Sequence, residues 1–168
     1  MLARLCRWLR VLGCDAVVVP DHLPRSEILS AAAEAGKSGR IFLTRCQKVA
    51  SSRNSAGVFW LTSDIIQEQL AHVMEHFGIR MESADVMSRC SRCGSAELAP
   101  VSHEEAAAAE EVTEHLLSKV SKFWQCGGCG KMFWIGPKSE SAMQILRAVA
   151  ETLPERCRGM CVDAKQQP

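Results

Sequence analysis

Two cysteine pairs of identical spacing are the most chemically specific feature of the sequence. Cys90 and Cys93 stand in the segment SRCSRCGS, and Cys126 and Cys129 stand in FWQCGGCGKMFWIG. A Cys-x-x-Cys turn directs two sulfur atoms toward one point, so two such pairs offer four thiolates to a single ion. Four thiolates leave no open coordination position for water or substrate. We therefore expect a structural zinc site rather than a catalytic one.

The alternatives for these cysteines are four free or buried thiols, or a redox pair of the thioredoxin type. A redox site needs only one pair and a βαβ context, whereas this sequence repeats the spacing, and the repetition favours zinc. We expect the aromatic residues around the second pair to pack a zinc ribbon that is too small to form its own core. Stacking on nucleic-acid bases is the alternative role for these rings, which are Phe123, Trp124, Phe133 and Trp134.

A second metal-binding pattern occurs in the segment HVMEH. His72 and His76 match the H-x-x-E-H motif of inverzincin proteases, and on a helix the two rings share one face. The motif is short, however, and the sequence offers no evident third ligand. We therefore interpret both histidines as solvated side chains of an amphipathic helix.

Composition limits the class of protein. With 168 residues, of which 47% are hydrophobic, the chain is long enough for one compact domain and a small appended module. It has no apolar run of the roughly 20 residues that a membrane span needs, so no membrane is expected. The formal net charge of +1 neither favours nor excludes nucleic acid as a partner. Nine cysteines without a secretory signal indicate an intracellular location, in the cytoplasm or an organelle.

The arginine-rich first segment is compatible with a mitochondrial targeting sequence. Arg4, Arg7 and Arg10 precede the first acidic residue, Asp15, as in a mitochondrial transit peptide. The segment passes directly into a predicted strand, and this favours a helix of the folded domain instead.

The elements that must position these residues alternate between helix and strand. Apolar residues at helical spacing predict three helices, which end at Gly13, Gly36 and Gly78. Short β-branched or aromatic runs predict the strands DAVVV, RIFLT and GVFWLT, at residues 15–19, 40–44 and 57–62. This alternation is typical of an α/β fold with a mostly parallel sheet flanked by helices.

The long segment between the cysteine pairs predicts an inserted helix. Ser102 and Glu105 form an S-x-x-E capping box, acidic residues fill the first turns, and Lys119 lies near the far end. The expected organisation is an α/β domain over residues 1–84, a zinc ribbon with a C-terminal helix over 85–150 and a tail over 151–168, with a linker near 79–88.

Four segments, taken in order, carry a family resemblance. They are MLARLCRWLRVLGCDAVVV, SEILSAAAEAGKSGRIFLTR, SRCSRCGSAEL and KFWQCGGCGKMFWIG. This order resembles the Mut-seven C-terminal ribonuclease family, over roughly residues 1–146. The resemblance implies a PIN-like domain joined to a zinc ribbon. It also implies cleavage of RNA with Mg2+ or Mn2+, which carboxylates hold at the ends of parallel strands.

The resemblance suggests three candidate catalytic acids. Glu27 matches an acidic family position at the start of the second helix, Asp64 is expected near the same strand ends, and Asp21 is a weaker candidate. The ordinary alternative for Glu27 and Asp64 is a carboxylate in the first turn of a helix, where the helix dipole favours it in any case.

This chain departs from the family pattern at three places. The family carries an Asp on a strand before its first helix, and we expect a chain that begins at Met1 to lack both the strand and the acid. The family's Leu-Thr-Arg-Asp is here Leu43-Thr44-Arg45-Cys46, and a thiol is a poor ligand for magnesium. A Gly-Ser-His of the family is replaced by Gly136-Pro137-Lys138.

Two functions therefore compete. The first is a metal-dependent ribonuclease, in which Mg2+ or Mn2+ acts beside structural Zn2+, either as this chain alone or as part of a longer polypeptide. The second is a catalytically degenerate module that binds RNA or protein, for example as a ribonucleoprotein subunit, and Cys46 favours this function. RNA is the expected partner. The candidate phosphate-binding residues are Arg4, Arg7, Arg10 and Arg45. Their alternative role is to form an ordinary solvated basic surface.

Overall fold

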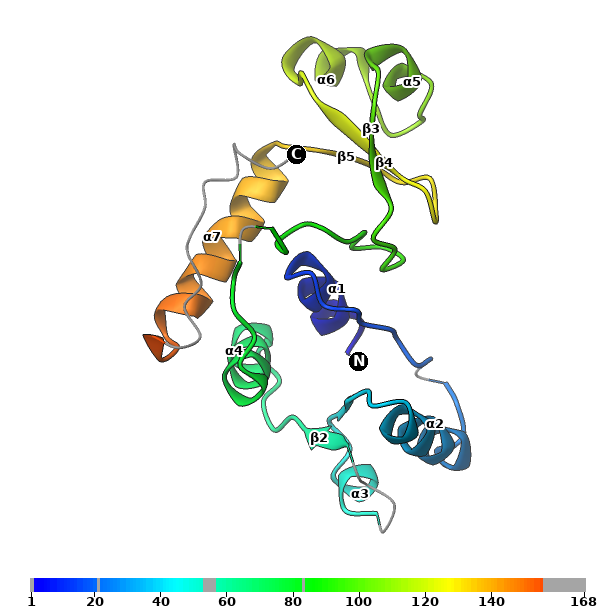
Figure 1. Cartoon of the computed structure of the whole chain (residues 1–168), viewed down its shortest axis with the longest axis vertical. Coiled ribbons are helices and arrows are strands. Elements are labelled where there is room, and N and C mark those ends of the chain that lie inside the picture. The colour runs from blue at the N-terminus through cyan, green and yellow to red at the C-terminus, as the bar shows by residue number, and fades with distance from the viewer. Residues whose placement is uncertain (1, 21, 53–56, 83, 156–168) are drawn as a thin grey trace.

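The computed structural model describes residues 2–20, 22–52, 57–82 and 84–155. It is a mixed α/β structure, with a small parallel sheet toward one end, an antiparallel sheet toward the other, and long helices between them (Figure 1). At this level the predicted α/β class is confirmed. None of the described helices combines the length and the apolar composition that a membrane crossing requires.

The parallel sheet has two short strands. β1 (Phe42–Thr44) pairs in parallel with β2 (Val58–Trp60), and both lie within strands that the sequence predicts. α2 (Arg25–Lys37) precedes β1, and the short α3 (Gln47–Ala50) follows it. Apolar and aromatic residues in the strands suit a layer that is covered by helices.

The third predicted strand is wrong. Residues 15–19 form no strand, and Val17 and Val18 are 70% and 41% exposed. The composition of this segment is that of a buried strand, but a strand also needs a hydrogen-bonded neighbour. Within the described part of the chain, the parallel sheet consists of β1 and β2 and offers this segment no partner.

Three helices build the main core between the two sheets. α1 (Ala3–Val11), α4 (Ile66–Phe77) and α7 (Pro137–Glu151) bury apolar residues at helical spacing against one another. Their buried core residues are Leu5, Leu9, Leu70, Val73, Met74, Met143, Leu146 and Val149. α7 follows the second cysteine pair in the chain and therefore returns to pack with the N-terminal helices (Figure 1).

The segment predicted as a linker, residues 79–88, belongs to the same core. Met81 and Val86 are 3% and 4% exposed. The Met87 amide donates a 2.6 Å hydrogen bond to the Val11 carbonyl at the end of α1. The described part of this segment thus contributes apolar residues to the core on both sides of residue 83.

Glycine ends two of the three predicted helices as expected. Gly78 is the left-handed C-cap of α4, with a φ of +64°, and Gly13 follows α1 with a φ of +84°. A Cβ at Gly13 would lie 2.6 Å from the carbonyl oxygen of Asp85, so its surroundings also require glycine. The third prediction is wrong by a few residues, because α2 continues past Gly36 and the left-handed position is taken by Gly39, with a φ of +71°.

The antiparallel sheet has three strands and two short helices packed on it. β3 (Leu98–Val101), β4 (Phe123–Cys126) and β5 (Met132–Trp134) pair in this order. α5 (His103–Ala107) and α6 (Glu114–Lys119) lie in the chain between β3 and β4.

The prediction of one inserted helix is therefore corrected to two. α5 begins at the predicted capping box, in which Ser102 and Glu105 bond each other's backbone amides. α6 has an N-cap of its own at Thr113, whose side chain accepts a hydrogen bond of 3.3 Å from the Leu116 amide. The bend between the helices brings Ala106 and Leu116 into one apolar cluster on the sheet.

The aromatic residues around the second cysteine pair divide between the two faces of this sheet. Phe123 and Met132 are buried under α5 and α6, and Trp134 packs against them. Since neighbouring residues of a strand face opposite ways, Trp124 and Phe133 lie on the other face, where they stand opposite each other in the register. Packing of the small sheet thus accounts for the first group of rings.

Candidate metal centre and the carboxyl edge of the parallel sheet

The two predicted cysteine pairs converge on one point. The sulfur atoms of Cys90 and Cys129 are 3.6 Å apart, those of Cys93 and Cys126 are 3.5 Å apart, and all four lie within 4.8 Å of one another. A tetrahedral ion with Zn–S bonds of about 2.3 Å separates its sulfur ligands by about 3.8 Å. The four cysteines therefore fit a tetrahedral thiolate site for an ion such as zinc.

Both cysteine pairs lie in loops of the same construction. We call the segments from Cys90 to Gly94 and from Cys126 to Gly130 the first and second cysteine loops. In each, the glycine amide donates a 2.8 Å hydrogen bond to the carbonyl of the first cysteine. The two glycines have φ angles of +90° and +70°, which side chains rarely tolerate. Each loop thereby turns back on itself and leaves its two thiols on the inside.

The metal-free thiols differ in acidity. A hydrogen bond from the Ser95 backbone lowers the pKa of Cys93 to about 7. Desolvation raises the pKa of Cys129 to about 12 and also raises the pKa of Cys126. Thiolates are the metal-binding form, so an ion must displace protons from these thiols when it binds.

Two arginines connect the first cysteine loop to the N-terminal helix. Arg10, which is 6% exposed, donates from Nη1 to the Arg92 carbonyl (2.7 Å) and from Nε to the Ala16 carbonyl (2.8 Å). Arg89 donates from Nε to the Gly13 carbonyl, at 3.0 Å. Sequence analysis missed this role, because Arg10 and Arg92 are 82 residues apart and no local pattern joins them.

The carboxyl ends of β1 and β2 form a second candidate site. Arg45 directly follows β1 and forms an ion pair with Asp64, which follows β2. The Arg45 side chain is 23% exposed and the Asp64 side chain is 78% exposed. Cys46 is exposed beside them. Asp64 therefore lies at the predicted strand edge, but its carboxylate is held by a guanidinium.

Glu27 lies near the same edge. It is exposed in the first turn of α2, and Arg25 in that turn donates to the Lys48 carbonyl in α3, at 3.3 Å. Asp21 falls outside the described residues. Among the residues that the structure describes, one group of three or more metal-binding side chains lies closely enough together to share an ion. That group is the four cysteines. The described carboxylates thus do not fit a Mg2+ or Mn2+ site on their own.

The candidate RNA-binding arginines have different surroundings. Arg4 and Arg7 are exposed on α1. Arg10 is buried, and its guanidinium is engaged with backbone carbonyls inside the protein. Arg45 is half-buried beside Asp64. The structure therefore gives Arg10 a structural role and leaves Arg4 and Arg7 as the accessible pair.

The two histidines of HVMEH pack against an aromatic ring. The Phe59 ring centroid lies 4.7 Å from that of His72 and 4.5 Å from that of His76. Neither histidine belongs to the metal-binding group found among the described residues. Both histidines are exposed, as interpreted from the sequence, and their rings lie against Phe59 of β2.

Comparison with known proteins supports a nuclease-like domain. The family model of the Mut7-C RNAse domain matches residues 1–146. A human protein described as "Exonuclease mut-7 homolog" is 34% identical over 111 residues, which cover 62% of this chain and 12% of the human protein. No solved structure gives a significant match. The family match extends from the start of the first helix through both cysteine loops, and the chain therefore belongs to the Mut7-C RNAse domain family.

Proposed function

We propose that this chain is an RNA-binding domain of the ribonuclease type that acts in RNA processing. The observation that carries the proposal is the match to a ribonuclease domain family over residues 1–146. In this proposal residues 1–84 are a PIN-like α/β domain, residues 85–150 are a zinc ribbon with its helices, and residues 151–168 are a tail. The parallel pairing of β1 and β2 beneath helices supports the first of these assignments.

The four cysteines are proposed to hold a structural Zn2+. All four coordination positions are filled by protein thiolates, so the bound ion supplies folding free energy and does not activate water. Cys126 ends β4, and the first cysteine loop is hydrogen-bonded to Arg10. The ion therefore fixes both the antiparallel sheet and its attachment to α1.

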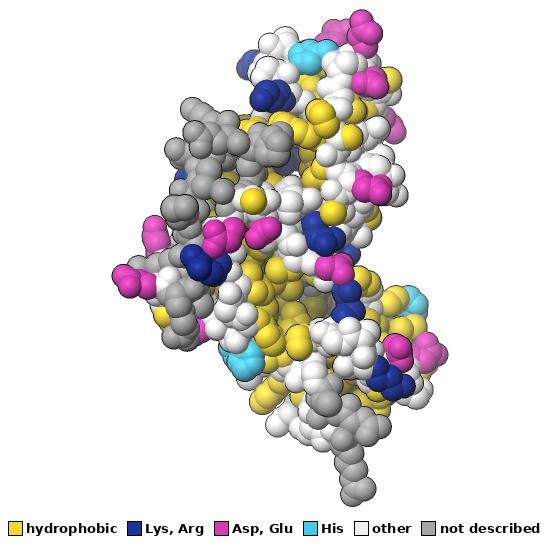
Figure 2. All heavy atoms as spheres, in the orientation of Figure 1, with side chains coloured by type: hydrophobic (Ala, Val, Ile, Leu, Met, Phe, Trp, Pro, Cys, Tyr) yellow, Lys and Arg dark blue, Asp and Glu magenta, His cyan; other side chains and the backbone are white. Residues whose placement is uncertain are grey.

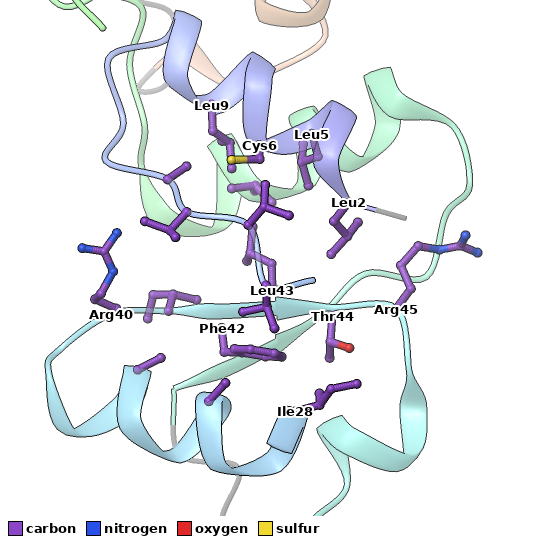
Figure 3. Close-up of a pocket in the computed structure, with 18 of the residues that line it drawn as sticks. Leu2, Leu5, Cys6, Leu9, Ile28, Arg40, Phe42, Leu43, Thr44 and Arg45 are labelled. Atoms are coloured by element: carbon purple, nitrogen blue, oxygen red, sulfur yellow. The ribbon is translucent and has the colours of Figure 1, made fainter. Parts of the chain in front are cut away.

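Contact with RNA is proposed to begin on α1. The exposed guanidinium groups of Arg4 and Arg7 suit phosphate oxygens, which supply the largest and salt-dependent part of nucleic-acid affinity. Figure 3 places Leu2, at the start of α1, at the same end of β1 as Thr44 and Arg45. A strand of RNA that follows α1 thus passes the carboxyl edge of the parallel sheet.

Catalysis, where it occurs, is proposed at this edge, with Glu27 and Asp64 as the acids and Asp21 as a third. A divalent ion such as Mg2+ or Mn2+ requires more oxygen ligands than the described residues bring together. An active enzyme therefore needs carboxylates beyond those that the structure describes, from Asp21, from a longer polypeptide or from a partner.

A second candidate is a domain that binds RNA without cleaving it. The ion pair between Arg45 and Asp64 favours this candidate, because a carboxylate already neutralised by a guanidinium is a weaker ligand for a metal ion. The thiol of Cys46 beside it adds no hard oxygen ligand. Such a domain suits a subunit of an intracellular ribonucleoprotein, in the cytoplasm or a mitochondrion. It also suits one part of a longer polypeptide, since the matched region is 12% of the human relative.

Cleavage of labelled single-stranded RNA with Mn2+ or Mg2+ separates the two candidates. The native chain is compared with Glu27→Gln and with Cys46→Asp, and RNA binding is measured on the same samples. Cleavage by the native chain that is lost in Glu27→Gln identifies an active ribonuclease. Binding without cleavage identifies the second candidate, and cleavage that appears in Cys46→Asp identifies the missing ligand. The absence of both binding and cleavage would rule out the proposed function.

A further inference from the structure

Two aromatic rings of the antiparallel sheet are not explained by packing of the described core. Trp124 of β4 and Phe133 of β5 are paired in the register and lie on the face opposite α5 and α6. Both rings are half-buried, and neither belongs to the two apolar clusters that the described residues form. Rings that keep surface exposed to solvent on two neighbouring strands are suited to contact a ligand.

A row of rings crosses this side of the sheet. Pro100 of β3 stands opposite Trp124, and Trp124 stands opposite Phe133. We call the side that carries these three residues the outer face. Neighbouring strands are about 4.8 Å apart, so the rings follow one another closely across the sheet. The outer face therefore offers flat apolar surfaces of the kind on which nucleic-acid bases stack.

Lysine side chains lie beside the two aromatic rings. The Lys131 ammonium is 5.1 Å from the centroid of the Phe133 ring, so it lies on the outer face. Lys122 is exposed directly before β4, two residues from Trp124. A cation over an exposed ring is held more weakly than a stacked base, and a lysine side chain is flexible. A base can therefore displace the Lys131 ammonium from Phe133 and leave it beside a phosphate.

The acidic residues of this half of the molecule accompany the helices. α5 contains Glu104 and Glu105, and α6 begins with Glu114. Glu111, between the two helices, accepts a 2.6 Å hydrogen bond from the Met132 amide of the edge strand β5. Figure 2 shows acidic side chains along the margin of the molecule where Figure 1 places α5. The cation on the outer face therefore favours an anionic ligand there.

We propose that Trp124 and Phe133 stack two successive bases of single-stranded RNA on the outer face. Lys131 and Lys122 then contact the phosphates of these nucleotides. The RNA must be unpaired, because the faces of its bases are hidden in a duplex, and aromatic residues of other RNA-binding sheets stack two or three unpaired bases. This inference rests on the proposed binding of RNA. It adds a surface that contacts bases to the arginines of α1, which contact the backbone.

The test is binding of two labelled RNA oligomers to the full zinc-loaded chain. The first is an oligomer of about eight uridines, and the second has abasic ribonucleotides in place of the central uridines, so that both carry the same charge. Fluorescence anisotropy at one salt concentration is expected to show at least about tenfold tighter binding of the first oligomer. Contacts of α1 with phosphates contribute equally to both affinities.

Substitutions of the rings locate the site. Trp124→Leu and Phe133→Leu are each expected to weaken binding of the uridine oligomer about tenfold and to leave binding of the abasic oligomer unchanged. Trp124→Phe keeps an aromatic face and should stay within about threefold of the native affinity. Phe77→Leu is the matched control, because Phe77 is 37% exposed at the end of α4, and it should change neither affinity. Bound zinc and the melting temperature are measured for every variant.

Photocrosslinking tests the native chain without any substitution. An oligomer that contains iodouracil bases is irradiated in complex with the chain, because such a base forms a covalent bond with an aromatic ring on which it stacks. Mass spectrometry of the digested chain then identifies the linked residue, which is expected to be Trp124 or Phe133. This result does not depend on the stability of a variant.

Three results would overturn the inference. The first is equal affinity of the native chain for the two oligomers, which would leave the proposed function standing with RNA bound through its backbone alone. The second is crosslinking confined to other residues, and the third is native affinity for the uridine oligomer in leucine variants that retain zinc. Binding of neither oligomer by the native chain would instead overturn the proposed function and this inference together.

Discussion

The Nη1 atom of Arg10 lies 2.7 Å from the carbonyl oxygen of Arg92 and joins α1 to the first cysteine loop. The same guanidinium donates to the carbonyl of Ala16, in the segment that follows α1. One buried side chain therefore joins the first cysteine loop to the segment that follows α1. Substitution of this arginine, or loss of the ion, is expected to affect both regions.

Removal of the Arg10 guanidinium should destabilise the fold. Arg10→Gln removes a buried charged donor from the Ala16 and Arg92 carbonyls, and we expect the free energy of unfolding to fall by about 2 kcal/mol. Arg7→Gln, an exposed change on the same helix, is the matched control and should cost less than about 0.5 kcal/mol. Urea unfolding of both zinc-loaded variants measures the difference. Equal midpoints would show that the Arg10 hydrogen bonds contribute nothing net.

Loss of one cysteine ligand should release the ion. Cys90→Ser removes a buried thiol of the four-cysteine group, and we expect bound zinc to fall well below one ion per chain. Cys46→Ser removes an exposed thiol outside the group and serves as the control, with zinc content unchanged. Elemental analysis after dialysis gives both values. Full zinc content in Cys90→Ser would exclude this cysteine as a ligand.

Zinc affinity should rise with pH. The raised pKa values of Cys126 and Cys129 mean that both thiols are protonated at neutral pH in the metal-free chain, and each must lose its proton when zinc binds. Below about pH 7, the pKa of Cys93, this thiol is protonated as well, and affinity should fall more steeply. Competition with a chromophoric chelator between pH 6 and 8 tests the slope. A pH-independent affinity would contradict thiolate ligation.

Alanine substitutions at Gly13 and Gly39 should distinguish the cost of backbone strain from the cost of a steric contact. Both have positive φ angles, so alanine at either position should cost about 1 kcal/mol through the backbone. Only at Gly13 would the new Cβ meet another residue, the Asp85 carbonyl oxygen at 2.6 Å, whereas nothing lies within 4 Å at Gly39. Gly13→Ala should therefore lower the unfolding free energy by at least about 1 kcal/mol more than Gly39→Ala does. Similar losses in thermal unfolding would refute the close approach of residues 13 and 85.

The exposed arginines of α1 should control the salt dependence of RNA binding. Each phosphate contact contributes about 0.7 to the slope of log affinity against log salt for a single strand. The double variant Arg4→Gln/Arg7→Gln should therefore reduce this slope by about 1.4, the sum of two such contacts. Lys37→Gln, at the far end of α2, removes an exposed charge and should leave the slope unchanged. Unchanged slopes in both variants would exclude α1 as the contact surface.

The sequence by itself determined the features that depend on neighbouring residues. Cys90 and Cys126 each begin a turn that closes at a glycine four residues later, and such a turn forms from local backbone preferences alone. The capping box of Ser102 and the left-handed Gly78 are local in the same way. Prediction therefore succeeded for the cysteine loops and for most helix ends.

Only the tertiary structure decided the features that depend on distant partners. Residues 15–19 have the composition of a strand, but strand formation needs a neighbour that the composition of the segment does not reveal. Arg10 looks like part of a basic helix face, but its side chain is buried and donates to the Arg92 carbonyl, 82 residues away. Asp64 is a candidate metal ligand by sequence, and only the structure shows that Arg45, from the end of the neighbouring strand, forms an ion pair with it. The physical reason is the same in all three cases. Hydrogen bonds and ion pairs depend on the distance between groups in space, and the spacing of residues along the chain does not give that distance.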